Sequence, residues 1–539
     1  MPRGVHSSVP SATILGAGAR LVDVQVDLSL GLPGFFLVGL PDSACIDAKV
    51  RVLTALRNGK WQLPQKKITV NLAPGDLRKE GASFDLPIAL GVLLSAGLLP
   101  EPLPRTLVLG ELSLGGDLLP VRGVLPIAIE ARRRGFENLV VPDSNAAEAA
   151  LVQGVRVLAA RSLEDAVELF TGQRVTTAFP SSQPELFSDS GLDMTDVRGQ
   201  ETAKRALLVA AAGGHNALLI GPPGAGKTML ARRLPGILPP LSFEEAIETT
   251  SLWSIAGRLK PGQGLLSERP FRAPHHTISV AGLVGGGSPP RPGEVSLALH
   301  GLLFLDEACE FGRAALESLR QPLEDGEISV VRARGGVTFP ARFMLVGAMN
   351  PCPCGHASDA DEKRCKCTLL QKETYLRRIS GPILDRVDLH VECAALKPRE
   401  LQGRLDGESS ASMRAKVLRA REAQRERLHN LGVHCNAQLR GRSLRELCPL
   451  DEKGRGALAG MLELHKLSAR SHDRILKLAR TIADLDGAER IQEGHVQEAA
   501  QLRCLDKPLK GRVIEPPAIL TARNRSTQGA GIPPAGEGA

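Results

Sequence analysis

The sequence predicts an α/β multidomain protein built around a parallel sheet. Two stretches carry this prediction. Residues 218–230 place a glycine-rich loop between an apolar run and a helical pattern, and residues 302–307 form a second apolar run that ends in two carboxylates. Ligands of open parallel sheets bind at such strand ends. With 539 residues, the chain is also long enough for several domains.

The region before the loop is expected to form a mixed α/β domain at residues 1–172. Alternating apolar residues predict its strands, and apolar residues on one face predict its helices. In chain order, the expected elements are strands at 19–28 and 34–39, helices at 42–58 and 84–96, a hairpin at 106–119 that turns at Gly115-Gly116, a helix at 127–135 and a strand at 138–141.

The remaining boundaries follow from composition. Residues 173–191 are rich in Ser, Thr, Pro and Gln, which is typical of a linker. The nucleotide-binding core is expected at 192–394 and a helical domain at 395–510. The tail at 511–539 contains Pro, Gly and Ser without periodicity and is expected to be disordered.

The loop after residue 220 fills every fixed position of the G-x-x-x-x-G-K-[ST] pattern. Its glycines allow backbone N–H groups to point at an anion, and the following helix N-terminus adds partial positive charge. Lys227 would reach the β- and γ-phosphates of ATP, and Thr228 would help to hold Mg²⁺. The predicted nucleotide-binding residues are Gly221, Pro222, Pro223, Gly224, Ala225, Gly226, Lys227 and Thr228.

A second set of residues completes the predicted ATPase chemistry. After the buried strand at 302–305, Asp306 would hold Mg²⁺ and Glu307 would act as the general base for the attacking water. Asn350 ends the next apolar strand, where such ATPases place a γ-phosphate sensor. Arg378 and Arg386 are both candidates for an arginine that reaches a neighbouring subunit. Arg470, with Arg474 as the alternative, is the candidate second sensor on a lid helix.

Two basic elements inside the core are candidates for contact with phosphates of nucleic acid. Residues 242–296 form a long stretch rich in Pro and Gly, which is more often functional than idle; its alternative role is a surface loop packed against a neighbouring subunit. Its basic members include Arg272, His275 and His276. Residues 327–346 predict a hairpin with Arg332 and Arg334 next to a turn at Gly335 and Gly336. An isolated basic hairpin is usually a solvated edge, but in the pore of a ring it would meet a threaded strand.

Four cysteines lie close together in two C-x-C pairs. Four thiolates can hold one tetrahedral Zn²⁺, and the polar segment between the pairs is too short to form a core without a metal. The alternative is a reduced, flexible loop. The predicted structural zinc ligands are Cys352, Cys354, Cys365 and Cys367.

Composition narrows the classes of function. The net charge of +8 suits a polyanionic partner, whereas an aromatic share of 3% argues against recognition built mainly on base stacking. No apolar run reaches membrane-spanning length, and residues 1–20 lack the apolar core of a signal peptide. We therefore expect a cytoplasmic protein that does not contact membranes.

Residues 79–85, followed by 110–135, resemble the proteolytic domain of Lon-type proteases, a ribosomal S5 domain 2-like fold. That family uses a Ser–Lys dyad, and Ser83 lies at the position of its nucleophile. The lysine is missing, because this chain has Leu125 in the corresponding turn. The resemblance therefore implies a Lon-protease-like α+β domain that is proteolytically inactive, with Ser83 as an ordinary serine that helps to cap a helix.

Over residues 10–510 the chain resembles the bacterial magnesium-chelatase-like AAA+ proteins of the ComM (YifB) type. The most specific motifs are EGASFDLPIAL, FRAPHHTIS, GEVSLALHGLLFLDE, NPCPCG and RISGPILDRVDLH. The resemblance implies a Lon-like N-terminal domain, an AAA+ P-loop core with a parallel sheet, and a helical lid. It also implies a homo-hexameric ring, promoted by ATP and DNA, whose hairpins move DNA as in MCM helicases.

The activity that this family implies is branch migration of recombining DNA during natural transformation. Its substrates would be single-stranded and branched DNA. Its partners would be proteins of the RecA-type recombinase pathway. By motif position, ATP hydrolysis would depend on Lys227, Thr228, Asp306, Glu307, Asn350, Arg386 and Arg470. An alternative is a magnesium-chelatase-like motor subunit that remodels a partner protein. A third reading, an ATP-dependent protease, is disfavoured by the missing lysine.

Overall fold

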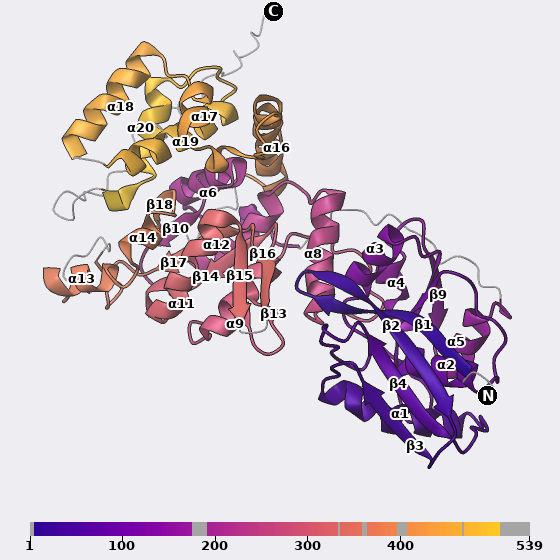
Figure 1. Ribbon diagram of the computed structural model, residues 1–539. Coiled ribbons are helices and arrows are strands. Elements are labelled where there is room, and N and C mark those ends of the chain that lie inside the picture. Colours follow the sequence, from indigo (N-terminus) through magenta and orange to yellow (C-terminus); the bar gives the residue numbers. More distant parts are fainter. Residues whose placement is uncertain are drawn as a thin grey trace, which may run out of the picture.

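The computed structural model describes residues 5–174, 191–332, 335–357, 364–395, 407–465 and 468–506. It shows an N-terminal α/β part, a central part built on a parallel sheet, and a group of C-terminal helices stacked on the side of the sheet away from the N-terminal part (Figure 1). The expected disordered tail at 511–539 lies outside the described residues, and so does most of the expected linker at 173–191.

The N-terminal part contains a four-stranded sheet and a smaller three-stranded one. The first sheet has the order β1-β2-β4-β3, in which β3 runs parallel to β4 and the other pairs are antiparallel. The second has the parallel order β5-β8-β9. The strands are β1 (Val5–Leu15), β2 (Gly18–Ser29), β3 (Gly34–Val38), β4 (Lys67–Ala73), β5 (Thr106–Val108), β6 (Glu111–Leu112), β7 (Leu118–Leu119), β8 (Asn138–Pro142) and β9 (Arg156–Ala160). The helices are α1 (Ser43–Asn58), α2 (Asp85–Ser95), α3 (Val124–Arg133), α4 (Ala146–Ala149) and α5 (Leu163–Phe170).

Most of the strands and helices expected here are confirmed, and two expectations are wrong. The hairpin is shorter than residues 106–119, because β5 pairs with β8 and only β6 and β7 pair with each other. Ser83 does not cap a helix, since Phe84 occupies the N-cap of α2 without a side-chain hydrogen bond. The first turn of α2 instead holds buried Asp85, which accepts hydrogen bonds from Arg51 at 2.6 and 3.0 Å.

The central part is a five-stranded parallel sheet in the order β11-β14-β17-β10-β18. In β10, Ala217 and Leu219 enter one hydrophobic core, whereas Leu218 and Ile220 enter another on the opposite face. Such a continuous apolar strand is typical of a parallel sheet covered on both sides. The strands are β10 (Ala217–Ile220), β11 (Phe271–Arg272), β14 (Leu302–Leu305), β17 (Met344–Met349) and β18 (Leu389–Glu392).

Helices and short pairs of strands surround this sheet. The long Pro- and Gly-rich stretch begins with helix α8, which was not expected from the sequence. A capping box between Ser242 and Glu245 starts this helix. The helices around this sheet are α6 (Glu201–Gly213), α7 (Lys227–Arg233), α8 (Phe243–Ile255), α9 (Val280–Val284), α10 (Glu294–Leu297), α11 (Arg313–Ser318), α12 (Arg320–Asp325), α13 (Leu369–Leu376) and α14 (Gly381–Leu384). The paired strands are β12 (Gly285–Gly286) with β13 (Arg291–Pro292), and β15 (Glu327–Arg332) with β16 (Gly335–Pro340).

The C-terminal part is helical, as expected, and shares one core with the sheet. Met413, Val417 and Ala420 of α16 lie in the same buried cluster as residues of α6 and β10. The helices are α16 (Ser410–Leu428), α17 (Gly441–Leu447), α18 (Glu452–His465), α19 (Ala469–Leu485) and α20 (Glu493–Gln501). None of the helices in the described part of the chain is long and apolar enough to cross a lipid bilayer.

The N-terminal part is joined to the core through α8. The buried carboxylate of Glu148 accepts hydrogen bonds from Ser254 of α8 at 2.6 Å, from Asn145 at 2.6 Å and from the Leu125 N–H at 3.3 Å. The Gly123 N–H, in the same turn as Leu125, donates to the Ser254 carbonyl at 3.2 Å. Hydrogen bonds between buried polar groups therefore connect the N-terminal part to α8 at this junction.

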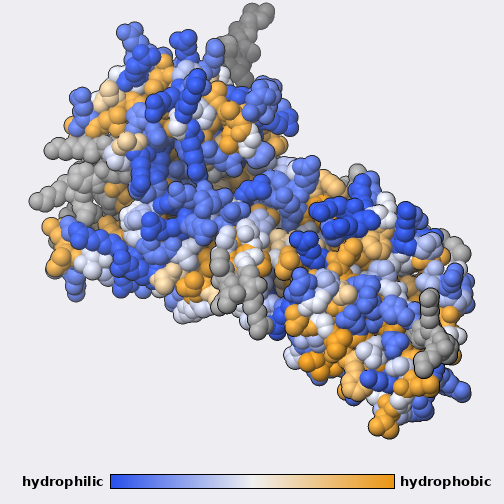
Figure 2. All heavy atoms as spheres, in the orientation of Figure 1, coloured by the Kyte–Doolittle hydropathy of each residue, from blue (hydrophilic) through white to orange (hydrophobic). Residues whose placement is uncertain are grey.

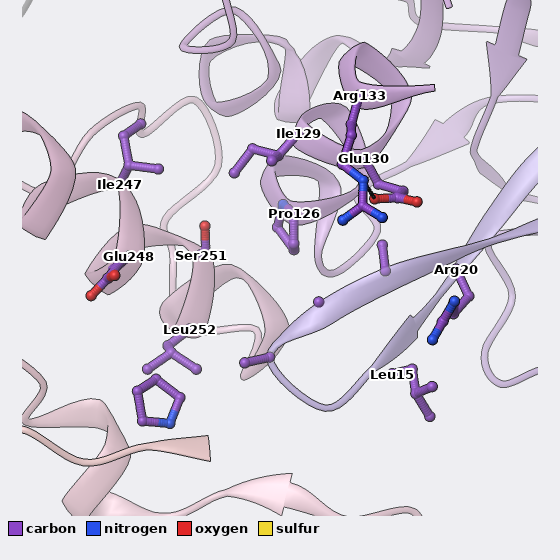
Figure 3. A pocket seen from close by; sticks show the side chains of 14 residues that line it. Leu15, Arg20, Pro126, Ile129, Glu130, Arg133, Ile247, Glu248, Ser251 and Leu252 are labelled. Atoms are coloured by element: carbon purple, nitrogen blue, oxygen red, sulfur yellow. Dashed lines mark ion pairs between the residues drawn. The ribbon is translucent and has the colours of Figure 1, made fainter. Parts of the chain in front are cut away.

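Beside this junction lies a cavity of about 580 Å³ between α3, α8 and the β1–β2 hairpin. In Figure 3, Pro126 and Ile129 of α3 face Ile247 and Ser251 of α8 across it. Gly16, at the tip of this hairpin, lies against β16. A Cβ atom on Gly16 would be only 2.8 Å from the side chain of Val337.

Exposed apolar side chains gather at the far end of the N-terminal part, around β3 and α1 (Figure 2). The members with the largest exposure are Leu30, Leu32, Ile46 and Val50. The surface over the C-terminal helices is mainly hydrophilic in the same view.

Candidate nucleotide site

The glycine-rich loop lies between β10 and α7 with the geometry that the sequence predicts. Gly224 and Gly226 adopt positive φ angles of 78° and 83°, a conformation that favours glycine. The Lys227 ammonium donates to the carbonyls of Gly221 at 2.6 Å and Pro222 at 2.9 Å. Burial lowers the pKa of this amine. Lys227 therefore lies inside the curl of the loop, where the phosphates of a nucleotide would be held.

Two other predicted residues, Asp306 and Asn350, meet the loop from two further strands. The Thr228 hydroxyl donates to Asp306 Oδ2 at 2.8 Å, which brings together the two side chains expected to hold Mg²⁺. Lys227 also donates to Asn350 Oδ1 at 3.3 Å. Because β10, β14 and β17 are parallel, the residues that follow them meet at one edge of the sheet. The structure therefore brings Lys227, Thr228, Asp306 and Asn350 into one cluster.

Glu307, the predicted general base, has an unexpected neighbour. Its carboxylate lies 3.7 Å from Nδ1 of His276, and its side chain is 61% exposed. From the sequence, His276 is expected only as a contact to DNA. No local spacing relates it to Glu307, since the contact depends on how the segment between β11 and α9 folds back over the strand end.

The predicted arginines are each bound to a carboxylate of this chain. Arg378 pairs with Glu310 at 2.9 Å and lies over the ring of Tyr375. Arg386 pairs with Glu324 and donates to the Pro382 carbonyl at 2.7 Å.

The two sensor candidates on α19 share a different carboxylate. Arg470 pairs with Asp385 at 2.5 Å, and Arg474 lies 3.7 Å from both Asp385 and Asp388. The roles of all four arginines at a nucleotide stay predictions.

The predicted DNA-contacting residues are distributed over two elements. Arg272 is half-buried, pairs with Glu294 at 2.6 Å and lies 5.5 Å from the centre of the Trp253 ring. His275 lies against His276, with their ring centres 4.1 Å apart.

The hairpin around Gly335 and Gly336 is present as β15 and β16, with Arg332 opposite Gly335. Arg334 and the side chain of Arg332 lie outside the described residues. A role in DNA binding stays a prediction for both elements.

The four cysteines of the C-x-C pairs converge. Their sulfur atoms lie within 4.8 Å of one another, and Cys365 Sγ is 3.8 Å from those of Cys352 and Cys354. Zn–S bonds of about 2.3 Å in a tetrahedron separate the sulfurs by about 3.8 Å. The backbone N–H of His356 lowers the pKa of the Cys354 thiol to about 6, which favours the thiolate that metals bind. The cluster fits a structural zinc, with Cys367 as its fourth ligand.

Three family models match the chain. "Magnesium chelatase, subunit ChlI" matches residues 193–401, "Subunit ChlI of Mg-chelatase" matches 24–145, and "Magnesium chelatase, subunit ChlI C-terminal" matches 407–503. Together with the parallel sheet and its glycine-rich loop, they define a magnesium-chelatase-like protein of the AAA+ type.

Relatives that match over nearly their whole length identify the family within this class. Competence protein ComM of Haemophilus influenzae is 45% identical over 513 residues, covering 93% of this chain and 98% of its own. YifB of Escherichia coli is 43% identical over 505 residues, with 93% and 98% covered. The chain belongs to the ComM (YifB) family of magnesium-chelatase-like proteins.

A more distant relative shares only part of the chain. The DNA repair protein RadA of Escherichia coli is 30% identical over 172 residues, which cover 30% of this chain and 35% of RadA. The family relationship and the glycine-rich loop indicate an ATP-binding protein.

Proposed function

We propose that this protein is an ATP-hydrolysing motor that moves branched DNA during homologous recombination and natural transformation. In this proposal it works in the cytoplasm as a homo-hexameric ring, drives branch migration with single-stranded DNA in its pore, and acts beside RecA-type recombinase pathway proteins. The observation that carries the proposal is the cluster of Lys227, Thr228, Asp306 and Asn350 at one edge of the parallel sheet. It supports ATP hydrolysis, and the relatives named ComM and RadA support action on DNA.

Each residue of the cluster has a task that its position suits. The backbone N–H groups of residues 224–228 and the Lys227 ammonium would bind the β- and γ-phosphates. The oxygens of Thr228 and Asp306 would hold Mg²⁺, since both are the hard donors that this ion prefers. Bound there, Mg²⁺ neutralises charge that develops on the phosphate oxygens. Glu307 would take a proton from the attacking water, and Asn350 would orient that water or the γ-phosphate.

The residues outside the cluster would act between copies of the chain and between its parts. Arg386, or Arg378 in its place, would stabilise the transition state in a neighbouring subunit. Arg470, or Arg474, would approach the same nucleotide from α19, which makes the C-terminal helices a lid. Arg272, His275, His276 and the β15–β16 hairpin with Arg332 and Arg334 would bind DNA phosphates, consistent with the positive net charge.

One alternative function rests on the family models themselves. Their descriptions name a magnesium chelatase subunit, so a motor that remodels a partner protein is the second candidate. ATP hydrolysis that responds to a protein partner and not to DNA would distinguish it.

Proteolysis is not part of the proposal. Leu125, which stands where the Lon-type lysine would be, is fully buried and donates its N–H to Glu148. Degradation of casein by the wild type, lost in Ser83→Ala, would contradict this part of the proposal.

The first experiment is ATP hydrolysis with and without single-stranded and forked DNA. We expect DNA to stimulate the wild type and Lys227→Ala to lose hydrolysis in both conditions. Lys453→Ala, which removes an exposed lysine on α18, is the matched control and should behave as the wild type. Hydrolysis that is indifferent to DNA would contradict the DNA motor and favour the partner-remodelling alternative.

A further inference from the structure

The cavity between α3, α8 and the β1–β2 hairpin has the size and lining of a binding site. Its volume of about 580 Å³ lies within the range of about 300–1,000 Å³ that is typical of ligand pockets. In Figure 3, Pro126 and Ile129 of α3 face Ile247 of α8 across it. Apolar walls on two sides suit a ligand with an apolar body.

Ser251 of α8 adds a polar group to this lining. The residue is 7% exposed, and its Oγ makes no hydrogen bond within the described part of the chain. A helical hydroxyl often donates to the carbonyl four residues earlier, as Thr249 does to Glu245 at 2.7 Å and Thr250 does to Ala246 at 2.6 Å. The Ser251 hydroxyl instead points into the space between α8 and α3 (Figure 3). A buried hydroxyl without a partner costs free energy, which a polar group of a ligand would recover.

The two ends of the cavity differ in charge. Arg20 stands at the hairpin end, is exposed and forms no ion pair with any residue that the structure describes. Arg133 lies on the same side in Figure 3 and shares the carboxylate of Glu130 with Arg134, at 3.5 and 2.8 Å. Three arginines against one carboxylate leave positive charge at this end. Because the α8 end contains the carboxylate of Glu248, an anionic group of a ligand would lie at the hairpin end.

The cavity also adjoins the β15–β16 hairpin, which we propose as a DNA contact. Pro340 at the end of β16 lines the cavity. The preceding residue, Phe339, is fully buried in a small core with Leu252 of α8, and Ala17 of the β1–β2 hairpin packs against this core. A single strand of DNA on the β15–β16 hairpin would therefore have the cavity beside it.

We propose that this cavity takes up one unstacked base of single-stranded DNA, whose phosphates bind Arg20 and Arg133. This inference rests on the proposed DNA motor and adds a contact to DNA at the junction with the N-terminal part. A nucleotide unit combines a flat, largely apolar ring, a polar edge for the Ser251 hydroxyl and an anionic phosphate. Proteins that hold a base outside its stack use apolar contacts to its faces and hydrogen bonds to its edge. A saturated acyl chain would leave Ser251 without a partner.

The test measures binding of DNA to the full-length protein by fluorescence anisotropy. Two labelled probes of equal length are compared, an oligothymidylate and an abasic oligonucleotide, with Mg²⁺ and a non-hydrolysable ATP analogue present. We expect the wild type to bind the oligothymidylate more tightly, because only this probe offers bases to the cavity.

Two changes at Ser251 address the base. Ser251→Leu fills the cavity from α8, and we expect it to lower the affinity for the oligothymidylate by about tenfold, which is within the range of one base contact. Its affinity for the abasic probe should stay that of the wild type. Ser251→Ala removes only the hydroxyl and should lower the affinity for the oligothymidylate by about two- to fivefold. Thermal unfolding of each variant shows whether it is folded.

Arg20→Ala addresses the phosphates. We expect weaker binding of both probes, with a slope of log affinity against log salt that is smaller by about 0.7, the value for one phosphate contact to a single strand. Arg57→Ala is the matched control, because it removes an exposed arginine at the end of α1. It should bind both probes as the wild type does.

Two results would overturn the inference. A folded Ser251→Leu variant with the affinity of the wild type for the oligothymidylate would show that the cavity holds no base. An equal loss of affinity for both probes would show that the change disturbs backbone contacts and not a base contact. If the wild type binds neither probe, the proposed DNA motor fails and the inference with it. That result differs from DNA binding by the wild type that no change at Ser251 alters, which contradicts the inference alone.

Discussion

The hydrogen bond between Thr228 and Asp306 holds together two residues that are far apart in sequence and that we propose as ligands of one Mg²⁺ ion. We predict that Thr228→Val lowers the apparent affinity for Mg²⁺ in ATP hydrolysis by about ten- to a hundredfold, because it leaves Asp306 without its partner. Thr228→Ser keeps the hydroxyl and should retain most of the affinity. The measurement is a magnesium titration of hydrolysis at saturating ATP. Equal titration curves for the valine variant and the wild type would contradict a magnesium role for this pair.

Some residues of the candidate site are marked by a local sequence pattern, whereas others are recognised only from contacts that the folded chain makes. Lys227, Thr228 and Asp306 could be predicted because local patterns mark the ends of parallel strands, and the sheet then brings those ends together. His276 could not be paired with Glu307, since no local pattern encodes a contact made by a folded-back segment. The carboxylate of Glu148 was missed for the same reason: its partners come from three separate segments.

Among the elements, the cysteine loop offers the most direct test. We predict that purified protein contains one zinc ion per chain and that Cys365→Ser or Cys367→Ser lowers this content strongly, because three thiolates hold the metal less tightly than four. Cys504→Ser changes a cysteine outside the cluster and is the control. Zinc is measured by mass spectrometry of the metal. Zinc-free wild-type protein, purified without chelators, would contradict the structural zinc.

The junction between α8 and the N-terminal part should make stability depend on pH. Burial raises the pKa of Glu148 above its ordinary value of 4.5. Between these two pKa values the folded state holds a proton that the unfolded state has released, so stability falls as pH rises above 4.5. We predict that the melting temperature of the wild type falls relative to Glu148→Gln as pH rises above 4.5. Differences that stay constant over this range would contradict the prediction.

At the level of elements, most strands and helices followed from periodicity, and the failures have particular causes. The expected hairpin at 106–119 was too long because β5 finds a parallel partner that lies later in the chain. Helix α8 was overlooked because the Pro and Gly content around it outweighed its capping box, although Ser242 and Glu245 stand at the spacing of such a box.

For the whole molecule, the proposed ring makes a prediction about mixed subunits. Lys227→Ala lacks a working loop and Arg386→Ala lacks the candidate arginine, so each should be inactive alone. In a mixed ring, an intact loop of one variant would face an intact arginine of the other. We predict that mixing the two variants restores part of the hydrolysis, and that a mixture with Arg378→Ala distinguishes the two candidates. No recovery in either mixture would contradict an arginine that acts between subunits.

The close approach of Gly16 to Val337 has a consequence for how this family diversifies. A side chain at position 16 would crowd Val337 of β16, and a smaller residue there would relieve this crowding but not the strain that a φ of 64° places on residues other than glycine. We therefore expect the effect of a substitution at position 16 to depend on the residue at position 337. A chimaera that takes only the N-terminal part or only the β15–β16 hairpin from a distant relative should pack poorly at this contact. A chimaera that takes both from the same relative should keep the packing.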